Sequence, residues 1–202
     1  MEEGLIGLMG GSFDPIHCSH IALAREAMEQ ASLHKVLFLV SGRPPHKQSL
    51  GASAQDRLAM ARLALENEPW AEASDVELRP GTVYTVDTLR LLQERLPGRS
   101  FAYIIGGDTL LDLRNWRRFP EVAGLCSFLA AMRGGVQDGP VRQEAKRLAE
   151  EFGARIRLLP LSPAPLSSTQ VRSRLRQGLS TEGLLPASVR EYIDQHQLYG
   201  EE

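Results

Sequence analysis

Short apolar segments alternate along the chain with longer segments in which apolar residues recur at helical spacing. The apolar segments, typified by KVLFLV, are too short for ordinary helices; they cover residues 5–9, 35–40, 100–108, 126–132 and 156–161. Strands that are separated by helices of ten or more residues pair in parallel through right-handed crossovers. The alternation therefore predicts an α/β fold, an open and doubly wound parallel sheet with helices on both faces. Such a sheet binds ligands beyond the carboxyl ends of its strands, where the strand order switches.

The bulk properties of the sequence limit the kinds of partner we expect. The 202 residues are expected to form one domain, with residues 178–202 as a C-terminal helical extension. The net charge of −2 comes from well-mixed acidic and basic residues, so we expect no nucleic-acid or membrane surface. Cys18 and Cys126 lie far apart in a chain that opens without an export signal, which favours reduced thiols and a cytoplasmic location.

The first unusual stretch, GGSFDPIHCSH at residues 10–20, directly follows the first apolar segment. Gly10 and Gly11 lack side chains where the backbone leaves the predicted strand, which lets a ligand approach main-chain N–H groups. A helix that begins near His17 adds its N-terminus to such an anion site. His17 and His20 are three residues apart, so on a helix they share one face and can reach the same phosphate. We interpret the stretch as a phosphate cradle.

Three other interpretations of this stretch have weaker support. Two glycines alone fit a plain turn before an ordinary helix. A zinc site made by His17, Cys18 and His20 lacks the four-residue histidine spacing and the glutamate of metalloproteases. A dehydrogenase fingerprint is also unsupported, because no third glycine stands at the required place and no acid ends the second strand.

Two further clusters follow predicted strands. GRPPHK at residues 42–47 offers His46 and Lys47 on a loop that two prolines stiffen, and its plainer interpretation is a polar surface loop. IIGGDTL at residues 104–110 places glycines and Asp108 after a strand. Asp108 is suited to accept hydrogen bonds from ribose hydroxyls, or to serve as the N-cap of the next helix.

A fourth cluster, LSSTQVRSRLR at residues 166–176, predicts a helix capped by Ser167 or Ser168. Hydroxyls at a helix start, with Arg172 one turn in, suit a polyphosphate. Taken alone, the cluster also fits a capped surface helix with solvated arginines. We favour the polyphosphate site because all four clusters fall at the same edge of the predicted sheet.

These stretches resemble a known family. GGSFDPIHCSH resembles the (T/S)FDP-x-H-x-G-H signature of the nucleotidylyltransferase superfamily, and LSSTQVR resembles its second signature, (I/L)SST-x-(I/V)R. Within the superfamily, PPHK, YTVDTL and IIGGDTLLDLRNW look like bacterial nicotinate-nucleotide adenylyltransferase. The resemblance implies a Rossmann-like sheet and the transfer of AMP from ATP to nicotinate mononucleotide, which yields the dinucleotide and pyrophosphate.

The resemblance also implies roles for individual residues. Contacts with the ATP phosphates during catalysis fall to His17, His20, Lys47 and Arg172. The residues implied to bind ATP elsewhere are Gly10, Gly11, Ser12, Phe13, Gly106, Asp108, Ser168 and Thr169. The pyridine mononucleotide is implied to contact His46, Tyr84, Thr85 and Trp116.

The implied cofactor is Mg²⁺, which we expect to arrive on the oxygens of ATP rather than on a protein-held cage of carboxylates. The chain departs from the family at Ser19, where glycine is usual, and at Gly107, where alanine is more common. Two adenylyl acceptors, nicotinamide mononucleotide and phosphopantetheine, are alternatives to the favoured one. A non-catalytic nucleotide sensor on the same fold is a third alternative. Homo-oligomerisation is left open.

Overall fold

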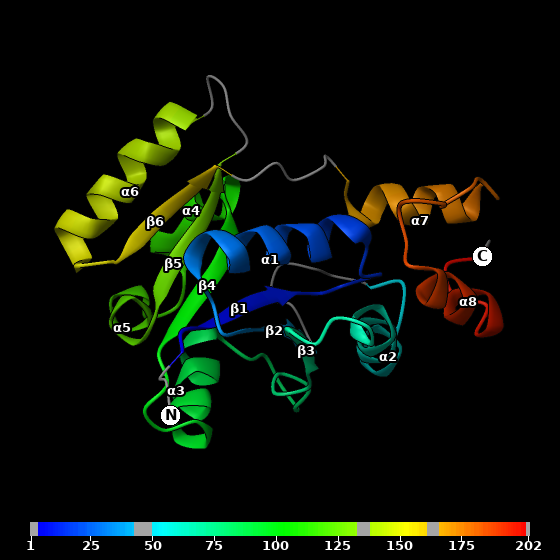
Figure 1. The fold of residues 1–202 in the computed structure, drawn as a ribbon, viewed down its shortest axis with the longest axis horizontal. Coiled ribbons are helices and arrows are strands. Elements are labelled where there is room, and N and C mark those ends of the chain that lie inside the picture. The colour runs from blue at the N-terminus through cyan, green and yellow to red at the C-terminus, as the bar shows by residue number, and fades with distance from the viewer. Residues whose placement is uncertain (1–3, 43–49, 133–137, 161–165, 201–202) are drawn as a thin grey trace.

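The computed structural model describes residues 4–42, 50–132, 138–160 and 166–200. Within them a single parallel sheet crosses the molecule (Figure 1). Its strands are β1 (Ile6–Gly11), β2 (Lys35–Val40), β3 (Ala71–Ser74), β4 (Phe101–Gly106), β5 (Ser127–Met132) and β6 (Ile156–Pro160). The order β3-β2-β1-β4-β5-β6 reverses direction between β1 and β4, which are hydrogen-bonded neighbours. The predicted doubly wound α/β sheet is confirmed, and its switch point lies at the ends of β1 and β4.

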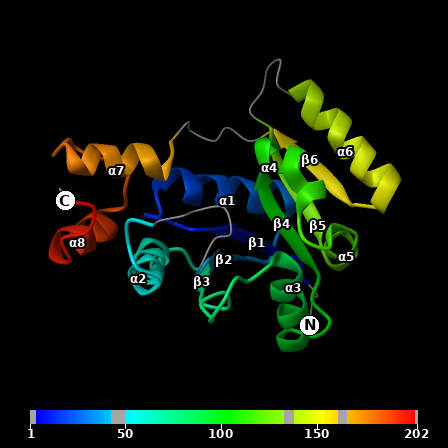
Figure 2. The same cartoon turned by 180° about the vertical axis from the view of Figure 1, so that it is seen from behind.

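Helices connect the strands and cover both faces of the sheet (Figure 2). They are α1 (Cys18–Ala31), α2 (Ala54–Leu65), α3 (Thr85–Arg95), α4 (Gly107–Asp112), the 3₁₀ turn η1 (Leu113–Asn115), α5 (Phe119–Leu125), α6 (Asp138–Phe152), α7 (Ser168–Arg176) and α8 (Ala187–Gln195). One core joins the sheet to α1, α2, α7 and α8, and the other joins it to α3, α4, α5 and α6.

Strand β2 shows why its residues form the middle of such a sheet. Val36, Phe38 and Val40 belong to one core, whereas Leu37 and Leu39 belong to the other. A strand buried on both faces reads as a continuous apolar run, so KVLFLV carries no polar alternation. The structure places β2 at residues 35–40, the same bounds that the sequence predicts.

Helix ends also follow local chemistry. Ser53 caps α2, because its Oγ accepts a hydrogen bond from the Asp56 N–H at 3.1 Å. Ser167 caps α7 in the same way, with Gln170 N–H as the donor at 3.3 Å. Of the two serines predicted to cap this helix, Ser167 is therefore the one that does. The N-cap of α4 is Gly106 rather than Asp108, so the predicted capping role of Asp108 is wrong.

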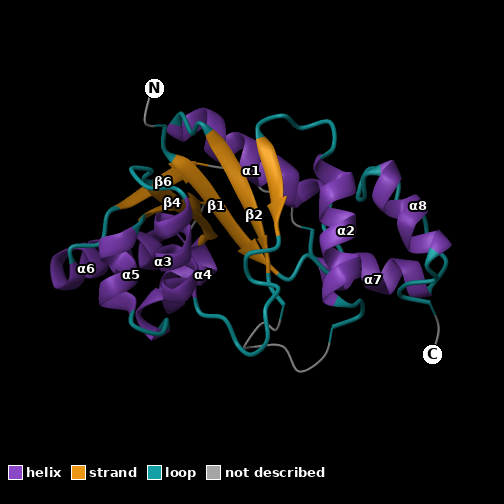
Figure 3. Ribbon diagram, turned by 90° about the horizontal axis from the view of Figure 1, so that it is seen from below, coloured by secondary structure: helices purple, strands orange, loops and turns teal. Residues whose placement is uncertain are grey.

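Three elements differ from the sequence-based expectation. The strand β3 (AEAS) was not predicted, because it is a four-residue edge strand with a single buried residue. The helix α5 was not predicted either. The C-terminal extension contains α8 over nine residues, with turns before and after it, rather than a helix through most of residues 178–202. It packs on α2 at the end of the molecule away from β6 (Figure 3), where Ser188 Oγ donates to the Leu63 carbonyl at 3.2 Å. Among the described residues, no helix has the length and apolar character needed to cross a bilayer.

Candidate active site

A cavity of about 810 Å³ opens beyond the carboxyl ends of β1 and β4. Its volume lies within the range of small-molecule and cofactor sites. Seven residues predicted from the sequence line it: Gly10, Gly11, Ser12, Tyr84, Thr85, Gly106 and Trp116. Glycines from β1 and β4 therefore line one part of the cavity. Aromatic residues from the start of α3 and from the segment after η1 line another part, which we call the aromatic end.

Gly10 is required by a close approach inside this cavity. A Cβ atom at Gly10 would lie 2.1 Å from the hydroxyl oxygen of Tyr103, which projects from β4. Tyr103 is 6% exposed, and its hydroxyl lies close to the Thr85 side chain at the start of α3. Burial raises the pKa of Tyr103, so the phenol stays protonated. The ring of Trp116 meets Tyr103 edge-on at 5.5 Å. The Tyr103 hydroxyl therefore lies where β1, β4 and α3 meet at the cavity wall.

We predict that Gly10→Ala lowers the free energy of unfolding by about 1–3 kcal/mol, because the added methyl group meets the Tyr103 hydroxyl. Tyr103→Phe removes the atom at 2.1 Å and leaves ring carbon Cζ at 3.1 Å as the nearest neighbour. The double variant is therefore expected to recover part of the loss, as measured by urea unfolding. Equal losses in both backgrounds would show that the hydroxyl is not the obstacle.

A buried carboxyl, Glu77, lies in the same cavity wall. It is 8% exposed and accepts a hydrogen bond from Thr88 Oγ1 of α3 at 2.9 Å. Burial raises the pKa of Glu77, while the Thr88 bond and the charge of Arg79 oppose that change. The Glu77–Thr88 bond connects the segment before α3 to the first turn of that helix, and so stabilises the helix start that carries Tyr84 and Thr85.

The two predicted histidines lie together at the start of α1. Their rings stack with centroids 3.6 Å apart and planes inclined by 23°. The His17 main-chain N–H donates to His20 Nδ1 at 3.2 Å, which assigns the proton of a neutral His20 ring to Nε2. His17 is 2% exposed, and its Nδ1 has no hydrogen-bond partner among the described residues. A buried polar atom without a partner is costly and marks a position where a ligand can supply the missing contact.

The main-chain amides at this helix start are less available than the sequence suggests. The Cys18 N–H donates to the Leu184 carbonyl, and the His20 N–H donates to the His17 carbonyl, both at 2.9 Å. The His17 N–H is also engaged, as described above. An anion at this position thus depends more on the imidazole rings than on these three amides. Ser19, which replaces the usual glycine, is 7% exposed and is accommodated inside the protein.

Burial lowers the pKa of His17 to about 4. The unfolded chain therefore binds more protons than the folded one between about pH 6.5 and pH 4, and stability falls as the pH is lowered through that window. The shift corresponds to roughly 3 kcal/mol. We predict that His17→Asn loses this share of the pH dependence, measured as the difference from wild type in urea unfolding at pH 7 and pH 4. Parallel curves for the two proteins would contradict the prediction.

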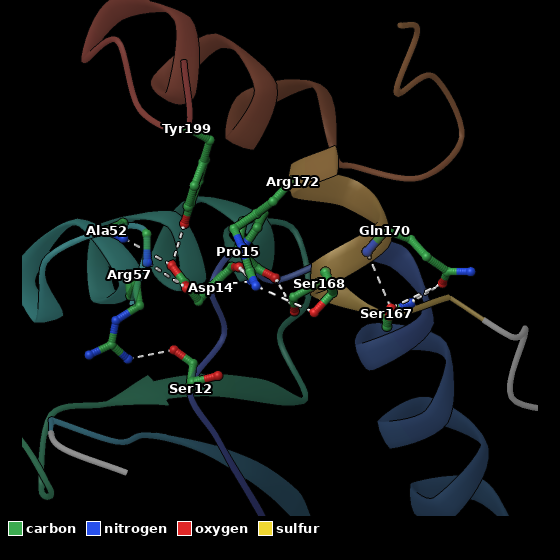
Figure 4. A network of polar contacts seen from close by, with 12 residues as sticks. Ser12, Asp14, Pro15, Ala52, Arg57, Ser167, Ser168, Gln170, Arg172 and Tyr199 are labelled. Atoms are coloured by element: carbon green, nitrogen blue, oxygen red, sulfur yellow. Dashed lines mark hydrogen bonds and ion pairs between the residues drawn. The ribbon is translucent and has the colours of Figure 1, made fainter. Parts of the chain in front are cut away.

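Asp14, between Phe13 and Pro15, is the centre of a buried polar network (Figure 4). The Asp14 carboxylate accepts hydrogen bonds from Gly51 N–H at 2.9 Å, Ala52 N–H at 3.1 Å and the Tyr199 hydroxyl at 2.8 Å. Asp14 is 1% exposed, so the charge is satisfied entirely by protein donors. The network joins the first motif to the end of the chain.

The second motif, LSSTQVR, is hydrogen-bonded to Asp14 and Pro15 of the first motif. Arg172 Nη1 donates to the Asp14 carbonyl at 2.6 Å and lies 3.5 Å from the Asp14 carboxylate. Ser168 Oγ donates to the Pro15 carbonyl at 3.0 Å. Arg172 Nη2 also donates to Thr169 Oγ1 at 3.3 Å. The structure thus brings Ser168, Thr169 and Arg172 to the first motif, with the Arg172 guanidinium held in place by protein acceptors.

A second arginine, Arg57 of α2, is completely buried. Its guanidinium donates to the main-chain carbonyls of Ser12, Ser41 and Gly42. These carbonyls follow β1 and β2, so one side chain joins the carboxyl ends of two neighbouring strands. Burial lowers the pKa of Arg57, and the charge of Asp14 opposes that change.

The remaining predicted residues are placed differently. His46 and Lys47 lie outside the described residues. The Phe13 ring is buried against Phe38 and meets His20 edge-on at 5.2 Å, so it supports His20 rather than lining the cavity. Asp108 is exposed in the first turn of α4. At Gly107, where the family more often has alanine, a Cβ would lie 3.3 Å from Val141 of α6.

Six residues of the site were not assigned a role from the sequence: Asp14, Arg57, Glu77, Tyr103, Arg117 and Tyr199. Asp14 lies inside the first motif, and this position is the signal in the sequence that could have identified it as a site residue. Arg57 and Tyr199 are far from the motifs in sequence, and nothing in the local pattern connects them to Asp14. Only the packing of α2 and the C-terminal extension brings these residues together.

Comparison with known proteins agrees with this geometry. The cytidylyltransferase-like family profile matches residues 8–174. A relative from Synechococcus sp. (strain JA-3-3Ab), named probable nicotinate-nucleotide adenylyltransferase, is 39% identical over 200 residues, or 98% of this chain and 96% of the relative. A protein of the same name from Laribacter hongkongensis (strain HLHK9) is 40% identical over 209 residues, or 98% and 95% of the two chains.

The fold also matches solved structures. The Plasmodium falciparum nicotinic acid mononucleotide adenylyltransferase complexed with NaAD superposes with a TM-score of 0.79 over 97% of both chains, at 20% sequence identity. At that identity the match concerns the fold. The profile match and the bacterial relatives show that the chain belongs to the cytidylyltransferase-like family and, within it, to the nicotinate-nucleotide adenylyltransferases.

Proposed function

We propose that this enzyme transfers AMP from ATP to nicotinate mononucleotide, giving nicotinate adenine dinucleotide and pyrophosphate in NAD biosynthesis. The observation that carries the proposal is one cavity that is lined both by the glycines at the carboxyl ends of β1 and β4 and by the aromatic residues Tyr84 and Trp116. A dinucleotide has a pyridine ring at one end and phosphates in the middle, and one continuous space of about 810 Å³ accommodates such a product. A cytoplasmic location is part of the proposal.

The chemistry requires positioning and charge stabilisation rather than a covalent nucleophile. A phosphate oxygen of the mononucleotide, already ionised at neutral pH, attacks the α-phosphorus of ATP. The new bond joins that oxygen to the α-phosphorus, and the bond from the α-phosphorus to the bridging oxygen of pyrophosphate breaks. The protein must hold two polyanions in line and stabilise the charge that develops on the leaving pyrophosphate.

His17 and His20 are proposed to donate hydrogen bonds to the ATP phosphates. With its pKa lowered to about 4, His17 is neutral at pH 7 before ATP binds, so it offers an N–H donor rather than a fixed positive charge. A bound polyphosphate raises the pKa of a nearby imidazole, because an opposite charge favours the protonated form. Arg172, held by Asp14, adds a permanent positive charge, and Lys47 is proposed to assist from the segment beyond β2.

Mg²⁺ is proposed to reach the site on the oxygens of ATP, where it neutralises phosphate charge. Within the described residues no group of three or more His, Cys, Asp or Glu side chains is arranged to hold a metal ion. The carboxylate of Asp14 is surrounded by protein donors. The donor set therefore fits a magnesium ion carried by its nucleotide. Separately, Gly106 and Asp108 are proposed to contact the adenosine ribose.

The proposal is tested by measuring pyrophosphate release from ATP with three acceptors: nicotinate mononucleotide, nicotinamide mononucleotide and phosphopantetheine. We expect kcat/KM to be highest with nicotinate mononucleotide. A higher value with either other acceptor would assign the enzyme to that substrate. Nucleotide binding without release from any acceptor would favour a sensor over an enzyme.

A further inference from the structure

Arg117 lies at the aromatic end of the cavity. It lines the same space as Tyr84, Thr85 and Trp116, and its guanidinium carbon lies 4.5 Å from the centroid of the Tyr84 ring. A guanidinium over an aromatic face is held by the attraction between the cation and the ring, while its N–H donors at the edge remain directed outward. The position therefore places a planar, permanently charged donor group beside the proposed pyridine site.

The neighbouring arginines differ from Arg117 in their partners. Arg114 pairs with Glu144 at 2.8 Å and with Glu151 at 3.3 Å, and Arg118 pairs with Glu121. For Arg117, by contrast, the described part of the chain supplies no carboxylate within ion-pair distance. Three arginines lie close together in sequence, and the one that lines the cavity is the one whose charge no described carboxylate neutralises.

The charge of the cavity explains why such a group matters. Glu77 and Asp112 also line the cavity, and both are acids. A substrate that carries a carboxylate on its ring meets repulsion from these acids, whereas an uncharged amide does not. A guanidinium at the aromatic end reverses this preference, because it pairs with a carboxylate through two parallel hydrogen bonds and gains little from an amide.

We propose that Arg117 is a specificity-determining residue, which makes the enzyme prefer a pyridine mononucleotide with a carboxylate over one with a carboxamide. This proposal rests on the proposed function and specifies its substrate. Tyr84 holds the guanidinium by its ring face, and the start of α3, steadied by the Glu77–Thr88 bond, sets the distance to the ring site.

The test compares the ratio of kcat/KM for nicotinate mononucleotide to that for nicotinamide mononucleotide in wild type, Arg117→Gln and Arg117→Lys. We expect Arg117→Gln to lower this ratio by about tenfold, through a higher KM for the acid and little change for the amide. Arg117→Lys is expected to retain part of the ratio, since it keeps the charge but loses the planar fork. Arg118→Gln is the matched control and should retain the wild-type ratio, because Arg118 pairs with Glu121 and does not line the cavity.

Binding measurements keep the inference separate from the proposed function. Trp116 lines the cavity, so in a Trp70→Phe background its fluorescence reports the binding of each mononucleotide without turnover. If the wild-type enzyme released no pyrophosphate, that result would count against the proposed function. The present inference would still be supported if wild type bound nicotinate mononucleotide with a lower Kd than nicotinamide mononucleotide and Arg117→Gln lost this difference. An unchanged ratio in Arg117→Gln overturns it, and so does equal weakening of both ligands, which would place Arg117 on the shared phosphate.

Discussion

Replacing His17 or His20 by alanine is expected to lower kcat for adenylyl transfer by about 10²- to 10³-fold, the usual cost of losing one donor aimed at developing charge. The stacked rings form one unit, with His20 oriented by its bond from the His17 main chain. We therefore expect the double variant to lose less than the product of the two single losses. Initial rates of pyrophosphate release at saturating ATP measure all three variants.

His34→Ala is the control for the histidine variants. His34 is exposed just before β2, at the amino ends of the strands and therefore at the opposite edge of the sheet from the cavity. It should retain wild-type turnover. Thermal unfolding distinguishes loss of chemistry from loss of structure, which matters because His17 is only 2% exposed. Near-wild-type kcat in both His17→Ala and His20→Ala would refute the proposed role of the rings.

The fold follows from the sequence wherever burial is strong. KVLFLV is apolar at every position but the first, because both faces of β2 are covered, and this pattern predicts its bounds without error. β3 is the opposite case. AEAS is a short edge strand with one buried residue, so its pairing with β2 depends on the neighbouring strand rather than on its own composition.

The site follows from the sequence less completely. The glycines were predicted to bind ATP and Trp116 to bind the pyridine mononucleotide, and the structure places all of these residues around one cavity. The partners of Asp14 could not be predicted in the same way. Tyr199 lies 185 residues away from Asp14 in sequence, and no periodicity or motif connects the two residues. Contacts of this kind arise from tertiary packing, which local patterns do not encode.

Two arginines, the buried Arg57 and the partly exposed Arg172, show how positive charge is fixed in place at this site. Arg172 and Arg57 both donate to main-chain carbonyls that follow β1 or β2, at Asp14, Ser12, Ser41 and Gly42. Both guanidinium groups thus hold the backbone of the phosphate cradle in position. The Arg172 side chain is also partly exposed to solvent. A polyphosphate site gains from this arrangement, because donors that are already fixed need no reorganisation when charge develops.

Arg57→Ala is expected to lower the free energy of unfolding by about 3–5 kcal/mol, the largest stability effect we predict for a single substitution. The substitution removes a completely buried side chain and leaves the carbonyls of Ser12, Ser41 and Gly42 without their donor. Arg57→Met fills most of the same volume without donors, so the difference between the two variants separates the cavity from the lost hydrogen bonds. Urea unfolding at pH 7 measures both.

Arg62→Ala on the same helix is the matched control. Arg62 is 59% exposed and lies 3.6 Å from Asp75, so its loss should change stability by no more than about 0.5 kcal/mol. Because Ser12 and Ser41 also line the cavity, Arg57→Met is expected to raise KM for ATP even at temperatures where the protein remains folded. A stable Arg57→Met variant with wild-type KM would mean that the ends of β1 and β2 hold their positions without the guanidinium.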